Sequence, residues 1–254
     1  MKLFAIVLFG LASPALAATD PSTATLYSGY YHASKGYAPR AVVGSFGDLY
    51  SGSTGIHFDL AYLDREQKAG FGAAGLSFDL GQGSRLKMMA GSSTANDNIL
   101  PSLFLMSSLQ FKPRDKWVVT PQLVYRRYRS GGSEIAPSIQ AAHYFNMGDA
   151  KRGYFVAQGD AGLSFTTRRN TGWSAGAGLT SVRANGLTFG ANVRAGYMAY
   201  DSIIGSDVRS SFYGGGATIG HRLSSRYDLY VRGDVTHTRF YTVSGAMLGL
   251  KVKL

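Results

Sequence analysis

The stretch Leu187–Tyr200, which reads LTFGANVRAGYMAY, restricts the fold of this chain more than any other sequence feature. Larger apolar side chains alternate along it with small or polar ones, so that Val193 belongs to one set and Arg194 to the other. A helix would mix the two sets, whereas a strand places them on opposite faces. Strands of soluble proteins usually span about 5–6 residues. This alternation lasts about 12, which suits a tilted strand that crosses a bilayer.

The same alternation recurs in about fourteen runs, separated by turns rich in Gly, Ser, Asn and Asp. Beyond the first residues no segment approaches about 18 consecutive apolar residues, which excludes a helical membrane protein. Unpaired backbone groups at a sheet edge are costly in lipid, so a spanning sheet must close. We therefore predict an all-β fold, a single antiparallel transmembrane β-barrel of about 14 strands (about 12–16), with short loops and both termini in the periplasm.

Two local features of the strands lead to further predictions. Pro121 removes a backbone donor, so its strand should bend or carry a bulge there. The triplet Gly214-Gly215-Gly216 could be a phosphate loop, but no helical pattern follows it, which favours a weak, curved strand over Phe212–Leu223. The eighth strand is expected over about Ser138–Asn146.

The N-terminus has the pattern of an export signal. Lys2 supplies the positive charge, Leu3–Leu11 the apolar core, and Ala15–Ala17 a small-x-small cleavage site. We expect residues 1–17 to be a signal peptide and residues 18–254 to be the outer-membrane β-barrel. The alternative, a membrane anchor, is disfavoured because the apolar core is too short to span.

The composition limits which binding partners and cofactors we expect for this chain. The formal net charge is +11, but the basic residues are mostly spread singly and an exported chain does not meet nucleic acid. More plausible partners are outer-membrane lipids and lipopolysaccharide, the barrel insertion machinery, and an anionic solute or polysaccharide. The chain has no cysteine, which excludes disulfides. No histidine pair has metal-ligand spacing, so neither a metal nor another cofactor is expected.

Taken together, the signal peptide, the alternating strands and a strand that runs to the final residue resemble the Gram-negative outer-membrane β-barrel class. The small size and the absence of a helical repeat domain resemble the YaiO-like barrels that are associated with envelope polysaccharides. The resemblance implies a location in the cell outer membrane. The resemblance assigns no functional residue to this chain.

Strand parity places charged side chains on the inner face of the predicted barrel. The candidate lumen and anion-binding residues are Lys87, Arg126, Arg194, Arg232, Lys251, Asp59, Asp160 and Asp234. Arg194 should meet water or a carboxylate, with Asp160 and Asp234 as its candidates by face. These charges could line a basic passage for anions, or they could pair and close the lumen, since a barrel of this size permits both.

An enzyme is the less favoured interpretation. A barrel hydrolase needs a nucleophile, a histidine within hydrogen-bond reach and an orienting partner. His32 with Ser34, and His237, are the nearest approaches to such a site, and both are more simply explained as rim or lumen histidines. Paired carboxylates among Asp59, Asp160 and Asp234 would suit a glycosidase, but each is expected to pair with a lumen base. No catalytic residue is assigned.

We therefore expect a non-enzymatic, porin-like channel that passes small solutes or a polysaccharide strand, with a basic, anion-leaning lumen. One alternative is an accessory or structural outer-membrane barrel of a polysaccharide or secretion system. A second is an outer-membrane enzyme that modifies lipid or glycan. The sequence indicates neither the substrate nor the oligomeric state.

Strand parity also predicts the topology. The extracellular loops should be Asp64–Lys68, Ser92–Asn98, Ser130–Ser133 and Asp201–Asp207. The periplasmic turns should be Gly81–Ser84, Lys112–Asp115 and Arg183–Gly186. Aromatic residues near the strand ends should form two interface girdles. The periplasmic girdle would comprise Tyr50, Phe111, Trp117, Phe145 and Tyr227, and the outer girdle Tyr31, Tyr62, Phe71, Tyr125, Trp173, Tyr197 and Phe212.

Overall fold

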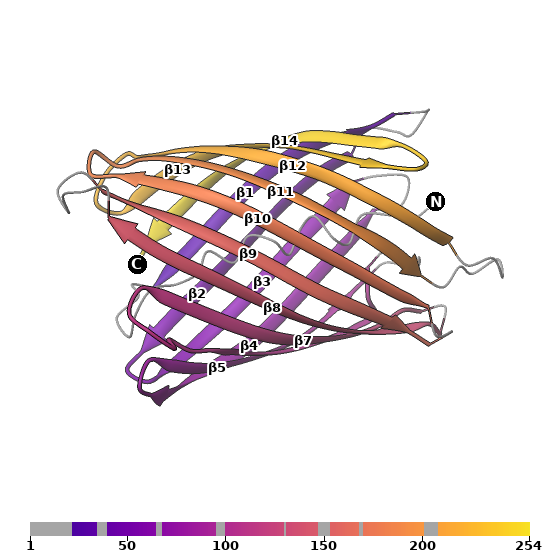
Figure 1. Ribbon diagram of the computed structural model, residues 1–254, viewed down its shortest axis with the longest axis horizontal. Coiled ribbons are helices and arrows are strands. Elements are labelled where there is room, and N and C mark those ends of the chain that lie inside the picture. The colour runs from indigo at the N-terminus through magenta and orange to yellow at the C-terminus, as the bar shows by residue number, and fades with distance from the viewer. Residues whose placement is uncertain are drawn as a thin grey trace.

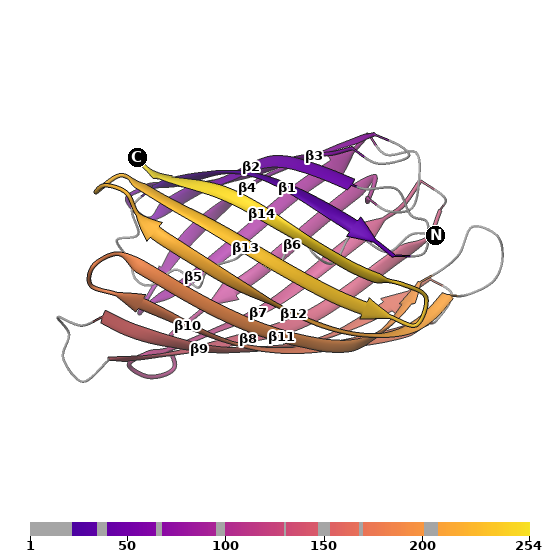
Figure 2. The same cartoon turned by 90° about the horizontal axis from the view of Figure 1, so that it is seen from above.

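The computed structural model is a closed barrel in which every strand pairs with its neighbours in the sequence and β1 pairs with β14 (Figures 1 and 2). The structure describes residues 22–34, 40–64, 68–94, 100–129, 131–146, 153–167, 170–200 and 208–254. The expected signal peptide at residues 1–17 lies outside them. The prediction of an all-β antiparallel barrel of fourteen strands is confirmed.

The strands span 11 to 14 residues in most cases, and they tilt steeply around the barrel (Figure 1). They are β1 Thr23–Ala33, β2 Arg40–Ser51, β3 Thr54–Asp64, β4 Ala69–Gly81, β5 Ser84–Ser93, β6 Leu103–Gln110, β7 Trp117–Arg127, β8 Ser133–Asn146, β9 Gly153–Thr166, β10 Thr171–Arg183, β11 Leu187–Tyr200, β12 Val208–Arg222, β13 Tyr227–Thr238 and β14 Thr242–Lys253. Strand β11 has the bounds that its sequence alternation predicts.

Both described termini lie at one end of the barrel, which we call the termini end. Thr23 pairs with Lys253, and the Leu254 N–H donates a hydrogen bond of 2.9 Å to the Ser22 carbonyl oxygen. The turns Gly81–Ser84, Lys112–Asp115 and Arg183–Gly186 lie at this end, and Asp64 and Lys68 lie at the other, which we call the loop end. The two predicted groups of loops are therefore separated as expected. Asp201–Asp207 lies outside the described residues.

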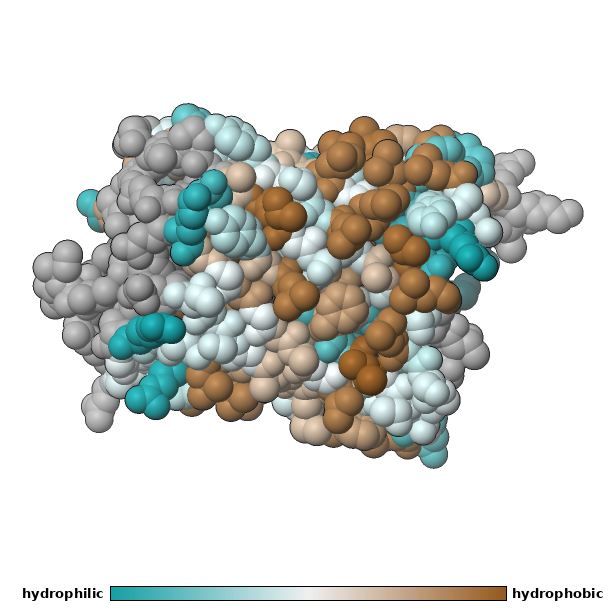
Figure 3. Space-filling view, turned by 180° about the vertical axis from the view of Figure 1, so that it is seen from behind, coloured by the Kyte–Doolittle hydropathy of each residue, from teal (hydrophilic) through white to brown (hydrophobic). Residues whose placement is uncertain are grey.

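The outer face of the barrel is apolar. Large hydrophobic side chains are exposed along it, for example Val193 at 65% and Leu60 at 52%. In Figure 3 brown, hydrophobic side chains gather across the wall, and teal, hydrophilic ones lie mostly towards the two ends. An apolar exterior of this kind suits lipid rather than water. In the part of the chain that the structure describes, no helix is long and apolar enough to cross a membrane.

The aromatic girdles are only partly as predicted. Trp117, Tyr227, Tyr62 and Trp173 are exposed on the outer face. The assignment was wrong for Tyr31, Phe71 and Phe212, which are buried on the inner face, and for Tyr50, whose ring lies beside His57 and Arg85 inside the barrel. The error arises because aromatic residues occur on both faces near the strand ends, so a position near an end does not fix the face.

Prolines interrupt pairing without changing its register. On either side of Pro121, β6 and β7 pair at Ser108↔Gln122 and again at the isolated bridge Phe111↔Val119, in one register. Of the two alternatives expected at Pro121, a bend or a bulge, the bulge is therefore wrong, and the missing N–H leaves a gap in the ladder.

Two strands also begin earlier than expected, β8 at Ser133 and β12 at Val208. Strand β8 includes Pro137, and its pairing with β9 skips from Ile135 to Ser138. The glycine triplet Gly214–Gly216 lies within β12, as the strand interpretation predicts.

Aromatic rings on the inner face lie over glycines of neighbouring strands. The Tyr27 ring covers Gly44, and the Tyr230 ring covers Gly249, where an added Cβ would lie 2.0 Å from the ring. These glycines leave room for the rings, so the aromatic side chains lie flat along the wall.

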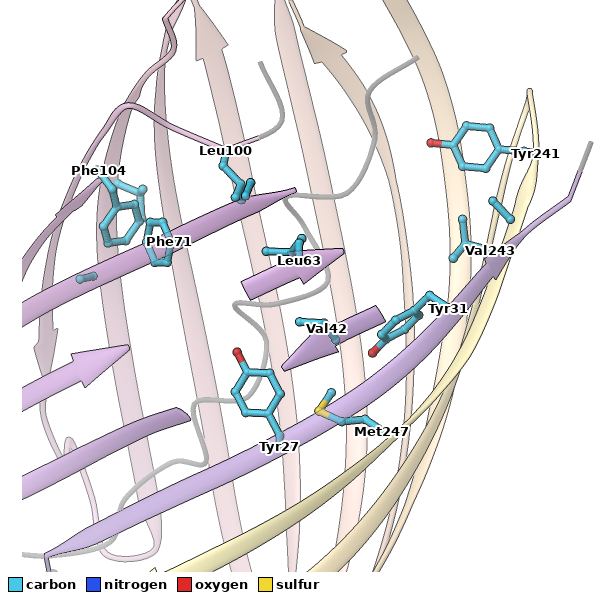
Figure 4. Packing of buried hydrophobic residues seen from close by; sticks show 14 residues of the cluster. Tyr27, Tyr31, Val42, Leu63, Phe71, Leu100, Phe104, Tyr241, Val243 and Met247 are labelled. Carbon is cyan, nitrogen blue, oxygen red and sulfur yellow. The ribbon is translucent and has the colours of Figure 1, made fainter. Parts of the chain in front are cut away.

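Near the loop end, the inner face of one part of the wall carries a buried apolar cluster (Figure 4). It consists of Tyr27, Tyr31, Ala33, Val42, Leu63, Ala69, Phe71, Ala73, Leu100, Phe104, Val124, Tyr241, Val243 and Met247. The Phe71 and Phe104 rings pack edge to face with their centres 5.8 Å apart. We call this set the apolar cluster.

Candidate functional site

The inner face of the barrel is the candidate functional site, because the charged residues of the strands gather there. All eight candidate residues, from Asp59 to Lys251, have the strand parity of the inner face. The contacts support this placement: the Lys87 ammonium on β5 lies 3.3 Å from the Asp48 carboxylate on β2, although β3 and β4 separate these strands. Side chains two or three strands apart can meet in this way only on the concave face.

Arg194 and Asp160 form an ion pair near the middle of the barrel. Arg194 Nη2 donates to Asp160 Oδ2 over 3.3 Å, from β11 to β9. Gly176 on the intervening β10 pairs with both residues, and a Cβ there would lie 2.6 Å from the Asp160 carboxylate. The glycine therefore makes room for the pair. Of the two carboxylates predicted for Arg194, the structure selects Asp160.

A second ion pair lies on β13. Arg232 Nη2 is 2.7 Å from Asp234 Oδ1, and Arg232 Nε donates to both carboxylate oxygens over 2.8 Å. Both side chains are largely buried, at 14% and 11% exposure. Asp234 lies over Gly216 of β12, where a Cβ would be 2.3 Å from the carboxylate. Glycine again provides the space beneath a charged group.

A third pair lies at the loop end between β7 and β8. Arg126 Nη1 donates to Glu134 Oε2 over 3.1 Å, and the Tyr128 hydroxyl donates to the same oxygen over 3.3 Å. Burial, together with the nearby Glu134 carboxylate, raises the pKa of Tyr128 above its usual range. Tyr128 therefore remains a neutral donor, and the Glu134 carboxylate is satisfied from two sides.

A polar cluster lies on β2, β3 and β5 near the termini end. Asp48 accepts hydrogen bonds from Lys87 and from Nδ1 of the buried His57. The Tyr50 ring lies edge-on to the His57 ring. The Arg85 guanidinium lies over the Tyr50 ring, 4.6 Å from the centre of that ring. The His57 ring thus contacts Tyr50 and Asp48, and Asp48 also binds Lys87.

This cluster does not provide a hydrolytic site. Ser77 on β4 carries a hydroxyl, but its Oγ and the Nε2 of His57 are both buried and form no hydrogen bond with any described residue, so no hydrogen bond joins the two. Ser77 is also completely buried, which leaves no path for a substrate. His32 and His237 have outer-face parity, and His237 Nδ1 is bonded to the Thr242 hydroxyl over 2.8 Å.

At the termini end, cations outnumber carboxylates on the inner face of β12 to β14. Lys253 lies 3.1 Å and Arg222 3.6 Å from the single carboxylate of Asp228. Lys251 is beside Asp228 in the strand register but forms no ion pair with the described residues. We call Arg222, Asp228, Lys251 and Lys253 the basic mouth.

The sequence interpretation missed several of these partners. Asp48, Glu134 and Asp228 share the strand parity of the inner face, so the alternation could have identified them as lumen residues. The contacts themselves depend on strand tilt and on glycines in intervening strands, which the alternation does not encode. Among the described residues no group of three or more His, Asp or Glu could hold a metal ion.

Comparison with known proteins identifies the class of fold. No protein-family model matches the chain, and neither does any curated protein. Among solved structures, KdgM porin in complex with disordered oligogalacturonate covers 91% of this chain and 99% of its own, with 8% identity and a TM-score of 0.51. A bacterial polysaccharide outer membrane secretin covers 92% and 98%, with 5% identity and a TM-score of 0.57.

A third similar structure is the outer membrane protein Omp33 of Acinetobacter baumannii. It covers 92% of this chain and 99% of its own, with 9% identity and a TM-score of 0.56. At these identities the likeness concerns the fold alone. The chain therefore has an outer-membrane β-barrel fold of the kind found in porins, and the predicted class resemblance is confirmed.

Proposed function

We propose that this barrel is a non-enzymatic channel of the outer membrane that passes small anionic solutes. One observation carries the proposal: the strands close into a barrel whose outer face is apolar and whose inner face carries most of the strands' charged side chains. An apolar exterior matches lipid, and a charged interior is stable only where water or counter-charges reach it.

The preference for anions comes from the basic mouth. Near mid-height the pairs Arg194–Asp160 and Arg232–Asp234 each join one cation to one carboxylate and contribute little net field. Asp59 forms no ion pair with another described residue, so no cation excess arises at this level. In the basic mouth, Arg222 and Lys253 pair with the single carboxylate of Asp228, and Lys251 lies beside it in the strand register. A cation excess at an entrance concentrates anions locally and raises their rate of entry.

Acidic saccharides are the first solutes to test. A solved porin of the same fold is in complex with oligogalacturonate, and another structure of this fold is a polysaccharide secretin. A uronate combines a carboxylate, which the basic mouth would attract, with hydroxyls that the amides and hydroxyls of the inner face can bind. Passage of a longer polysaccharide strand is the second candidate function, and the same two solved structures support it.

Planar-bilayer recording of the refolded chain tests the proposal. We expect discrete conductance steps and, under a salt gradient, a reversal potential that shows preference for anions. Lys251→Glu should shift the reversal potential towards cations, because it replaces one positive charge of the basic mouth with a negative one. Lys68→Glu, which makes the same change at the loop end, is the matched control. Absence of any conductance step from folded protein would overturn the channel.

The orientation is proposed from the fold class: the termini end faces the periplasm and the loop end faces outwards. Because the natural chain has no cysteine, single cysteines report location without background. On intact cells an impermeant reagent should label Lys68→Cys and spare Gln82→Cys. The reverse pattern would invert the barrel in the membrane without affecting the channel proposal.

A further inference from the structure

A groove at the termini end lies between two neighbouring hairpins. It is lined by Gln82 and Gly83 of the β4–β5 turn and by the segment Lys112–Val118, which leads from β6 into β7. Its volume is about 510 Å³. The stem of the Lys112 side chain lies against Gly83 of the neighbouring turn, since its Cδ is 3.3 Å from the position of a Cβ on Gly83. We call this feature the hairpin groove.

Among the described residues, no carboxylate forms an ion pair with the cations of the hairpin groove. Lys112, Arg114 and Lys116 line it together with a single acid, Asp115. None of the four belongs to an ion pair with another described residue, in contrast to the arginines of the inner face near mid-height. Three unpaired cations around one concave surface favour an anionic ligand.

The backbone of the groove favours a different residue at one of these positions. The Trp117 N–H donates to the Arg114 carbonyl oxygen over 3.1 Å, which closes a four-residue turn. Lys116, third in that turn, has a φ of +68°, a conformation that suits glycine better than a residue with a Cβ. The lysine at this position therefore adds a positive charge to the groove, although its backbone conformation is strained for a residue with a Cβ.

The groove adjoins a row of aromatic rings on the outer face. Trp117 lines the groove and is 41% exposed, and its ring centre lies 4.7 Å from that of His143. His143 stacks on Phe145, and Phe145 on Phe155 at 5.4 Å. The Tyr144 N–H also donates to the Lys116 carbonyl oxygen over 2.9 Å, which fixes the turn beside this row. Rings of this kind mark the level of the lipid headgroups.

We propose that the hairpin groove binds the phosphodiester headgroup of an anionic glycerophospholipid. The three cations would bind the phosphate, and the lipid chains would lie along the aromatic row and the apolar wall next to it. The site is independent of the channel and of the basic mouth, which lies on β12 to β14. A second phosphate-bearing source, free phosphate in solution, lacks the apolar part that the aromatic row would contact.

Native mass spectrometry of the refolded barrel tests this site. We expect phosphatidylglycerol to remain bound in preference to phosphatidylcholine of the same chains. Arg114→Gln and Lys116→Gly should each lower phosphatidylglycerol retention by about fivefold, the effect of one cation near a lipid surface. Lys116→Gly should leave the thermal midpoint unchanged or raise it, because glycine suits the positive φ.

Arg226→Gln is the matched control, since it removes one exposed cation from the β12–β13 turn at the same end of the barrel. Retention equal to that of the natural chain supports a local site. If Arg226→Gln weakens retention as much as Arg114→Gln, the preference reflects overall charge and the site is refuted. Displacement of the lipid by millimolar inorganic phosphate would likewise overturn the lipid proposal in favour of a soluble anion.

Discussion

Two parts of the inner wall are built in different ways. The apolar cluster near the loop end, contributed mainly by β1 to β4, β6, β7 and β14, fills the wall with buried side chains such as Phe71, Phe104 and Met247. The wall from β9 to β13 instead places glycines beside charged side chains, as where Gly176 lies between Asp160 and Arg194. The first part is held by contacts between side chains. The second depends on closely spaced backbone that leaves the charges room.

This difference indicates how one strand pattern serves two purposes. Apolar packing on an inner face stabilises the barrel but offers nothing to a polar solute. Glycines contribute little packing, yet they let carboxylates and guanidinium groups lie flat against the wall, partly exposed to the interior. We therefore expect substitutions in the apolar cluster to affect stability most, and substitutions of the charged residues to affect permeation most.

The largest effect is expected for Phe104→Ala. Phe104 is 3% exposed and packs edge to face on Phe71, so its loss should lower the free energy of unfolding by about 3 kcal/mol. Urea unfolding in detergent micelles would measure this. Leu103→Ala, at a 37% exposed neighbour on the outer face, is the control and should cost much less. Equal losses would mean that the apolar cluster contributes no special stability.

A smaller effect is expected for Gly214→Ala in the glycine-rich wall. A Cβ at this position would lie 2.4 Å from the Val235 carbonyl oxygen and 2.9 Å from the Thr236 Cα, so the backbone must shift. We expect a loss of about 1–3 kcal/mol in the same unfolding experiment. Gly159→Ala, where the nearest atom would be 3.7 Å away, should be tolerated. If both are tolerated, close strand packing does not hold this part of the wall.

The smallest stability effect is expected for Arg194→Gln. The Arg194 and Asp160 side chains are 34% and 32% exposed, so their ion pair should contribute only about 0–1 kcal/mol. Removing the cation leaves the Asp160 carboxylate uncompensated, and the reversal potential should move towards cations. A loss of stability as large as that of Phe104→Ala, with unchanged ion preference, would make Arg194 a structural residue.

The sequence could predict much of the fold because a strand exposes its faces with period two. That periodicity located β11 to the residue and placed Lys87, Arg194 and Asp234 on the inner face. It could not predict which charges meet, since Lys87 reaches Asp48 across two intervening strands. The predicted aromatic girdles were wrong at Tyr31 and Phe71. Aromatic residues occur on both faces of the barrel, so proximity to a strand end does not show which face a side chain occupies.

Modification of single cysteines on β11 during bilayer recording tests the central claim, that the inner face is the passage. Asn192 lies on the inner face near the middle of β11, and Val193 is 65% exposed on the outer face. An anionic, water-soluble thiol reagent should reduce the current of Asn192→Cys, because it adds a bulky charge to the passage, and should leave Val193→Cys unchanged. An equal response at the two positions, or none at Asn192→Cys in a conducting barrel, would contradict the account.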